Sequence, residues 1–291
     1  MQYECLLLAA SLRANAPTFS GTLYVAEPQA GPLWTKDPSM PGDIKGALEE
    51  LGAVILPFEN ETFGESYPHG NKIEALCAMP QGRNFLFLDS DTLILGDIGT
   101  LHTDFTRPSA SMRRTVTWPE EELYWPGYSA TWKSLYDRYG LAFEPTLDLD
   151  QPDEYWKRYL YFYAGWVMGH DAPAFRQRWR DWAVDIRDNR PEELVLQSLD
   201  PWLDQVALPL VIHSFGGGRP DDTLAGLDGE LTCHYRLLPL LYARGSDAVV
   251  KVLEDVTSPN KVKKWLKQYD AFKRMIYQGR GHKVRAMFNQ N

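Results

Sequence analysis

The sequence is poor in cysteine. It has only three, Cys5, Cys77 and Cys233, in 291 residues, and no two of them form a C-x-x-C pair. An odd number of scattered cysteines excludes a zinc ribbon and a disulfide framework. Because reduced thiols are typical of the cytoplasm, we expect a cytoplasmic protein.

Long apolar runs are also missing. No stretch approaches the roughly 20 apolar residues of a membrane-spanning helix. The opening MQYECLLLAASLRANA carries Glu4 and no basic n-region, and its apolar core is only Cys5 to Ala10. We therefore expect no signal peptide there. The sequence also shows neither an internal repeat nor a low-complexity linker.

Positive charge is in deficit over most of the chain. There are 30 Lys and Arg against 39 Asp and Glu, which gives a net charge of −9. Because nucleic-acid binding needs a basic footprint, this composition argues against it. The exception is the segment 259–291, which holds nine basic residues and one acid, Asp270.

What remains is an ordinary globular composition, 44% hydrophobic and 13% aromatic, with a pattern that predicts an α/β fold. Short buried strands alternate with helices, which favours a mostly parallel sheet flanked by helices. The segment 118–163 is expected to form loops and short helices. The predicted helices cover 3–13, 43–51 (capped by Asp43), 71–79 (capped by Asn71), 171–182 (begun by Asp171) and 201–210. The predicted strands cover 24–26, 53–58, 85–88, 161–168 and 231–235.

Two carboxylates follow one of these strands. In NFLFLDSDTLILGDIG, residues 84–99, Asp89 and Asp91 come directly after the apolar run 85–88. Ligands of such sheets bind at the carboxyl ends of strands, and residues two apart in an extended segment point the same way. Both carboxylates are therefore expected to reach one hard cation, Mg²⁺ or Mn²⁺. The alternative is that the two acids cap the next turn.

The D-x-D motif is one of several segments that resemble GT-A glycosyltransferases, most closely glycosyltransferase family 8. GNKIEAL precedes it, YFYAGWVMG is similar to the F-N-x-G element of that family, LDQVAL to its D-Q segment, and CHYR to its late histidine. The resemblance spans roughly residues 3–240. It implies a GT-A (Rossmann-like) domain, placed at 1–257, with 258–291 as a basic helical extension.

The resemblance also implies an activity. The chain is expected to be a metal-dependent hexosyltransferase that uses a nucleotide diphosphate sugar, most readily a UDP-sugar. It would transfer the sugar, with retained configuration, to a hydroxyl of a glycan, glycolipid or protein. His234 is implied as the third metal ligand, with His213 as its competitor. A nitrogen ligand beside two carboxylates favours Mn²⁺ over Mg²⁺.

The same reading assigns the donor-binding residues. Lys72 and Arg236 are expected to neutralise the diphosphate as it leaves, although a surface role is open for both. Ser90 and Ala164 belong to the motifs that contact the donor. Gly165 lacks a side chain, so the backbone could approach the ligand closely there.

Asp204 and Gln205 are implied to lie beneath the anomeric carbon as catalytic residues; the alternative is a polar pair on a helix surface. Two features depart from the family pattern. Tyr163 stands where the family has Asn, and the chain begins at the helix that follows the family's first, base-contacting strand. Both favour an alternative reading, a non-catalytic nucleotide-sugar or glycan binding protein.

A phosphohydrolase of the haloacid dehalogenase type is a further alternative, because it also carries D-x-D after a buried strand. That family needs a threonine two places after the motif, whereas Thr92 follows it directly. Asp221 and Asp222 would imitate its later acids. A nucleotidyltransferase is disfavoured because no glycine-rich basic loop occurs near the N-terminus.

The segment 260–277 has an apolar stripe at helical spacing. We expect a helix docked on the domain with a solvated basic face, or else a surface helix that contacts anionic lipid peripherally. The stripe comprises Val262, Trp265, Leu266, Tyr269, Phe272 and Ile276. The basic residues off the stripe are Lys263, Lys264, Lys267, Lys273 and Arg274.

Overall fold

The structure, a computed structural model, describes residues 1–113 and 117–288. The α-helices are α1 (Gln2–Asn15), α2 (Gly42–Glu50), α3 (Asn71–Ala75), α4 (Tyr128–Arg138), α5 (Ala172–Asp188), α6 (Leu203–Ser214), α7 (Leu238–Arg244), α8 (Asp247–Thr257), α9 (Asn260–Leu266), α10 (Asp270–Phe272) and α11 (Arg280–Phe288). The strands are β1 (Leu23–Pro28), β2 (Ala53–Phe58), β3 (Asn84–Leu88), β4 (Thr92–Ile94), β5 (Ser109–Ala110), β6 (Trp166–His170) and β7 (Thr232–His234).

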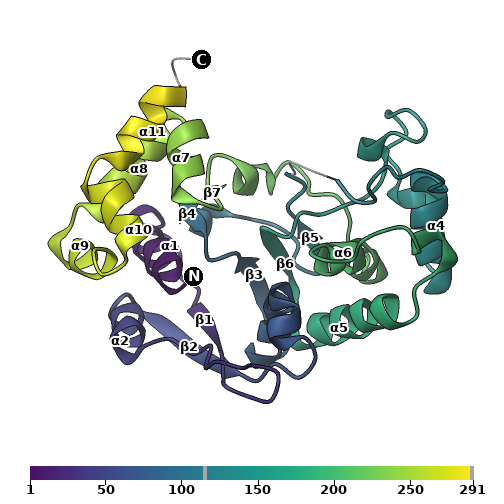
Figure 1. Cartoon of the computed structure of the whole chain (residues 1–291), viewed down its shortest axis with the longest axis horizontal. Coiled ribbons are helices and arrows are strands. Elements are labelled where there is room, and N and C mark those ends of the chain that lie inside the picture. Colours follow the sequence, from purple (N-terminus) through teal and green to yellow (C-terminus); the bar gives the residue numbers. More distant parts are fainter. Residues whose placement is uncertain (114–116, 289–291) are drawn as a thin grey trace.

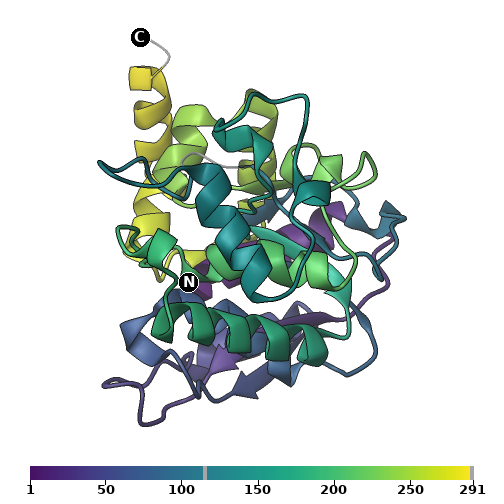
Figure 2. The same ribbon diagram turned by 90° about the vertical axis from the view of Figure 1, so that its right-hand side faces the viewer.

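The strands lie between two groups of helices. Figure 1 shows α1 beside the C-terminal helices on one side of the strands, and α4, α5 and α6 on the other. The view in Figure 2 brings the second group to the front. This arrangement confirms the predicted α/β class, in which helices cover a central set of strands.

The strand pairing is less parallel than predicted. β1 and β2 form a parallel pair, whereas β3–β6–β5 and β4–β7 pair antiparallel. Among the described strands, parallel pairing is therefore confined to the N-terminal pair. The partners β6 and β7 return from long excursions of the chain and run opposite to β3 and β4, so both sheets next to the carboxylates are antiparallel.

Three of the predicted elements begin differently from the prediction. Pro41 precedes α2, and Asp43 lies in its first turn without capping it. Asn71 is the first residue of α3, and its Oδ1 accepts a hydrogen bond from Asn60 at 2.8 Å instead of capping the helix. The strand expected at 161–168 starts at Trp166, because Ala164 adopts a left-handed φ of 56° that interrupts extended backbone.

Asp171 does cap α5, accepting from the backbone N–H of Ala174, and that helix continues to Asp188. The predicted strand at 53–58 coincides with β2, and the remaining predicted helices and strands are present with shifts of a few residues at their ends.

The basic C-terminal segment is docked on the rest of the molecule. Leu266 is 0% exposed and Phe272 3%, and both belong to the same apolar cluster as Leu6 and Leu7 of α1. The predicted single helix over 260–277 is broken into α9, α10 and a π-helical turn over Lys273–Tyr277. The break places the ring of Tyr269 flat against Tyr3, with centroids 5.0 Å apart. Residues 289–291 of the predicted extension lie outside the described residues.

A second apolar cluster lies among β3, β6 and the helices that pack on them. It joins β3 and β6 to α4, α5 and α6, and its largest buried side chains include Trp132, Trp179 and Tyr161. Many of the aromatic residues are therefore core residues. None of the helices in the described parts of the chain combines the length and apolar character that a membrane span requires.

Candidate active site

The D-x-D motif lies in the connection between β3 and β4, with Asp89 directly after β3 and Asp91 directly before β4. β3 ends at Leu88 opposite Trp166, and the next backbone N–H, that of Asp89, donates to Gly165 O at 3.0 Å. Ser90 and Asp91 form the turn itself, which is not the extended segment predicted from the sequence. The Asp91 backbone O accepts from Tyr235 N at 3.0 Å, so both ends of the turn are fixed.

The register of β4 against β7 brings in the histidine. Thr92 lies opposite His234, which places the imidazole beside both carboxylates. His234 Nε2 is 3.2 Å from an oxygen of Asp91 and 3.7 Å from one of Asp89. One possible ligand atom from each of the three residues falls within 4.8 Å of the other two. His213, the competing histidine, lies at the opposite end of α6 from Asp204.

These three side chains fit a divalent cation. Two carboxylates and an imidazole are the donor types that Mn²⁺ accepts readily, and the atoms already converge. All three side chains are about one-fifth exposed, which leaves room for a ligand to approach. Burial raises the pKa of Asp89, and the neighbouring charges of Lys72 and His234 oppose that rise.

Lys72 lies within the site and not on the surface. Its Nζ is 3.3 Å from Asp89 Oδ1, 3.5 Å from Asp204 Oδ2 and 3.4 Å from the carbonyl oxygen of Ala164. The side chain is 13% exposed. Burial lowers its pKa, but the carboxylates of Asp89 and Asp204 outweigh that effect and raise it overall, so the amine stays protonated.

Asp204 and Gln205 lie in the first turn of α6, and each accepts a hydrogen bond from a tyrosine hydroxyl. Tyr67 donates its hydroxyl hydrogen to Asp204 Oδ1 at 2.6 Å, and its oxygen accepts from the Asp204 backbone N–H at 3.0 Å. The Tyr161 hydroxyl donates to Gln205 Oε1 at 2.8 Å. Asp204 is 1% exposed and Gln205 8%, so they are not a polar pair on a helix surface.

Tyr67 and Tyr161 are functional candidates that the sequence pattern missed. Burial and the Asp204 charge raise the pKa of Tyr67 well above its ordinary value, which keeps the hydroxyl a donor to that carboxylate. Neither tyrosine lies in a recognisable motif with its partner: Tyr67 is 137 positions from Asp204, and Tyr161 is 44 positions from Gln205.

The segment 163–165 forms a wall of the site. Gly165 faces His234 so closely that a Cβ there would overlap the imidazole Nδ1. Arg236, with a left-handed φ of 63°, places its guanidinium over the ring of Tyr163, 4.2 Å from the centroid. The ring of Tyr163 therefore makes a cation–π contact with Arg236, at the position where glycosyltransferase family 8 has Asn.

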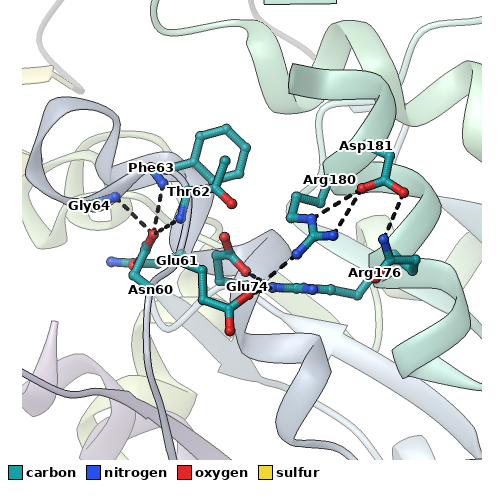
Figure 3. Close-up of polar contacts among 11 residues, drawn as sticks. Asn60, Glu61, Thr62, Phe63, Gly64, Glu74, Arg176, Arg180 and Asp181 are labelled. Atoms are coloured by element: carbon teal, nitrogen blue, oxygen red, sulfur yellow. Dashed lines mark hydrogen bonds and ion pairs between the residues drawn. The ribbon is translucent and has the colours of Figure 1, made fainter. Parts of the chain in front are cut away.

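The short helix that carries Lys72 is anchored to α5 by charge. Glu74 forms a buried ion pair with Arg176, and Glu61 approaches Arg176 at 3.5 Å and Arg180 at 3.4 Å. Figure 3 shows this cluster beside Asn60, whose Oδ1 accepts from three successive backbone N–H groups. The contacts fix α3, and Lys72 with it, against the helix that follows β6.

The chain is similar to a known protein family. No curated protein matches it, and no solved structure does. Among protein families, the Rhodobacterales glycosyltransferase domain matches residues 1–216. That range includes the D-x-D turn, Lys72, Asp204 and Gln205, while His234 and Arg236 follow it. Because the match covers well over half of the 291 residues, the chain belongs to the Rhodobacterales glycosyltransferase domain family.

Proposed function

We propose that the chain is a metal-dependent, GT-A-type glycosyltransferase similar to family 8. It would move a sugar from a nucleotide diphosphate sugar, most readily a UDP-sugar, to an acceptor hydroxyl. The observation that carries this proposal is the convergence of Asp89, Asp91 and His234 next to the Lys72–Asp204 pair. The family match supports glycosyl transfer; the metal, the donor and retention of configuration are our inference.

Asp89, Asp91 and His234 would hold the cation, Mn²⁺ in preference to Mg²⁺ because one ligand is nitrogen. When bound, it would supply positive charge that stabilises the leaving diphosphate. Gly165 keeps the space beside the His234 imidazole open. The imidazole can therefore turn its Nε2 toward the two carboxylates.

Lys72 and Arg236 would bind the donor diphosphate by charge. Lys72 already bridges Asp89 and Asp204, so its ammonium group is fixed before a ligand arrives. The left-handed backbone of Ala164 directs its carbonyl oxygen to Lys72, while Gly165 presents bare backbone. Ser90, on the turn between the two acids, would contact the donor with them.

In the transfer, the bond between the anomeric carbon and the donor phosphate oxygen breaks. A bond from that carbon to the acceptor oxygen forms, and the proton of the acceptor hydroxyl passes to the departing phosphate oxygen. Asp204 and Gln205 are proposed to lie beneath the anomeric carbon and stabilise positive charge that develops there. The Tyr67 and Tyr161 hydroxyls hold their oxygens in place for that role.

We further propose that residues 1–257 are the catalytic domain and 258–291 its basic extension, in a cytoplasmic protein that contacts membranes peripherally. Cys5, Cys77 and Cys233 are unpaired, which suits a reducing compartment. Lys261, Lys264 and Lys267 recur every three residues of α9 and the residue after it, on the side away from the buried Val262 and Leu266. These lysines form a positively charged face that would attract anionic lipid headgroups.

The test is donor binding by the variant Asp91→Asn. We expect Mn²⁺ with UDP or a UDP-sugar to raise the melting temperature of the wild-type chain, and EDTA to abolish the rise. Asp91→Asn should lose the rise and keep an unchanged melting temperature without ligand. Asp137→Asn, an equally conservative change at a 58% exposed position, is the matched control.

An unchanged ligand response in Asp91→Asn would overturn the metal assignment. Donor binding without sugar transfer or donor hydrolysis would instead support the non-catalytic binding protein, the reading that Tyr163 in place of Asn favours.

A further inference from the structure

A cavity of about 710 Å³ lies at the end of α6 away from Asp204 and Gln205. It is lined by the loop 145–150, by Gly217, Gly218 and Arg219, and by Arg107, Leu160 and His213. Its volume is within the range of small-molecule sites. None of these residues has a role in the metal and donor site.

The cavity and the metal site are joined by two elements. Asp204 and His213 are nine positions apart on α6, about 13 Å along a helix. Leu160 lines the cavity and Ala164 contacts Lys72, and four residues of chain span at most about 14 Å. The two sites therefore lie within the length of a short oligosaccharide.

The cavity walls balance charge with apolar surface. Arg107 and Arg219 offer donors, Asp148 and Asp150 offer acceptors, and the two signs cancel. Arg219 is fixed, since its Nη2 donates to Thr146 O at 3.2 Å and to Arg158 O at 3.0 Å. Leucine side chains from the loop 145–150 and Leu160 add apolar wall.

This chemistry favours a neutral sugar over an ion. Each sugar hydroxyl both donates and accepts a hydrogen bond, so it satisfies guanidinium and carboxylate groups at once, and C–H faces pack on leucine. A phosphate or carboxylate ligand would be repelled by the two aspartates while it is attracted by the two arginines, so its charge gains no net attraction from these walls.

We propose that this cavity binds a neutral saccharide, namely the part of a glycan acceptor that lies beyond the reacting hydroxyl. The acceptor role rests on the proposed function, whereas saccharide binding in the cavity does not require metal or donor. The two can therefore fail separately.

Gly218 gives a clean way to block the cavity. A Cβ at Gly218 would meet no atom within 4 Å, so the side chain of Gly218→Trp starts from open space at the cavity wall. Gly31 has the same open surroundings and lies far along the chain from the cavity, so Gly31→Trp is the matched control. Asp150→Ala, at an exposed lining position, is a second variant that removes one acceptor without adding bulk.

The experiment measures binding of neutral oligosaccharides, maltohexaose, cellohexaose and mannohexaose among them, by calorimetry in EDTA without nucleotide. We expect at least one to bind the wild-type chain, Gly31→Trp and Asp91→Asn equally. Gly218→Trp should bind it at least about tenfold more weakly, and Asp150→Ala should also weaken it. If none binds the wild-type chain, or if both cavity variants bind normally, the proposal is wrong.

The same variants separate this proposal from the proposed function. Gly218→Trp should keep the Mn²⁺-dependent response to UDP, because the donor residues are elsewhere. Loss of saccharide binding in Gly218→Trp, together with an unchanged UDP response in Asp91→Asn, would uphold the cavity and overturn the metal site.

Discussion

At the scale of single residues, the site depends on the lack of a side chain at Gly165. Residue 165 accepts a backbone hydrogen bond from Asp89 and faces the His234 ring on its other side. A methyl group at residue 165 would overlap the imidazole of His234. The imidazole cannot easily move away, because the pairing of β7 with β4 holds it in place. The glycine thus couples the position of one acid to that of the histidine.

Gly165→Ala is therefore expected to displace the imidazole and weaken Mn²⁺ binding about 10- to 100-fold, the range found when ligand orientation is disturbed. The measurement is the free Mn²⁺ signal in electron paramagnetic resonance during titration of the chain. Gly46→Ala, where the new Cβ meets nothing within 4 Å, should leave Mn²⁺ binding unchanged. Equal affinity in Gly165→Ala and wild type would show that His234 is not a ligand.

The sequence predicts the acids better than the groups that hold them. Asp89 and Asp91 stand out because they follow an apolar strand two positions apart, a local pattern. Tyr67 leaves no such pattern, since its hydrogen bond to Asp204 exists only after the segment around Tyr67 has packed against α6. Long-range hydrogen bonds of this kind form only in the tertiary structure, so the hydrophobic periodicity of the sequence does not predict them.

At the scale of elements, the bounds of a strand were predicted correctly where buried residues set the sequence pattern. They were predicted wrongly where an unusual backbone conformation ends the strand. The strand at 53–58 coincides with β2 because two turn regions bound it. The strand predicted at 161–168 was misplaced by Ala164, whose left-handed φ no propensity of alanine indicates. The antiparallel pairing of β3 was also not predicted. The direction in which β6 enters the sheet depends on the path of the long segment between the two strands, which the sequence pattern does not show.

The buried pair between α3 and α5 gives a prediction at this scale. Glu74 is 0% exposed and Arg176 7%, so removal of either partner leaves an uncompensated charge in the interior. We expect Arg176→Met to lower the free energy of unfolding by about 3–5 kcal/mol, measured by urea denaturation. The double variant Glu74→Leu with Arg176→Met should recover most of that loss, because both charges are then gone.

If the double variant is as unstable as Arg176→Met alone, the loss of stability comes from the changed shape of the side chains and not from an unpaired charge. Arg187→Met, on the same helix but 39% exposed, is the control and should change stability by less than about 0.5 kcal/mol.

At the scale of the whole molecule, charge is divided between two regions. The segment 259–291 carries nine basic residues and one acid, on a chain whose net charge is −9. The sequence predicts this division and the apolar stripe, and the structure shows the stripe used for docking: Val262, Leu266 and Phe272 are buried beside α1. Membrane contact would therefore come from the exposed lysines and not from insertion of the stripe.

Binding to lipid vesicles tests this division of charge. The wild-type chain should sediment with vesicles that contain phosphatidylglycerol and should dissociate from them as the salt concentration is raised. It should not bind vesicles of pure phosphatidylcholine. Lys264→Glu with Lys267→Glu removes two basic charges at exposed positions and should weaken binding at least about 30-fold, at roughly 1 kcal/mol for each. Lys133→Glu with Lys157→Glu makes the same change of net charge outside the basic segment and should have little effect. If both double variants bind anionic vesicles equally, attraction follows overall charge and the C-terminal helices are not a lipid contact.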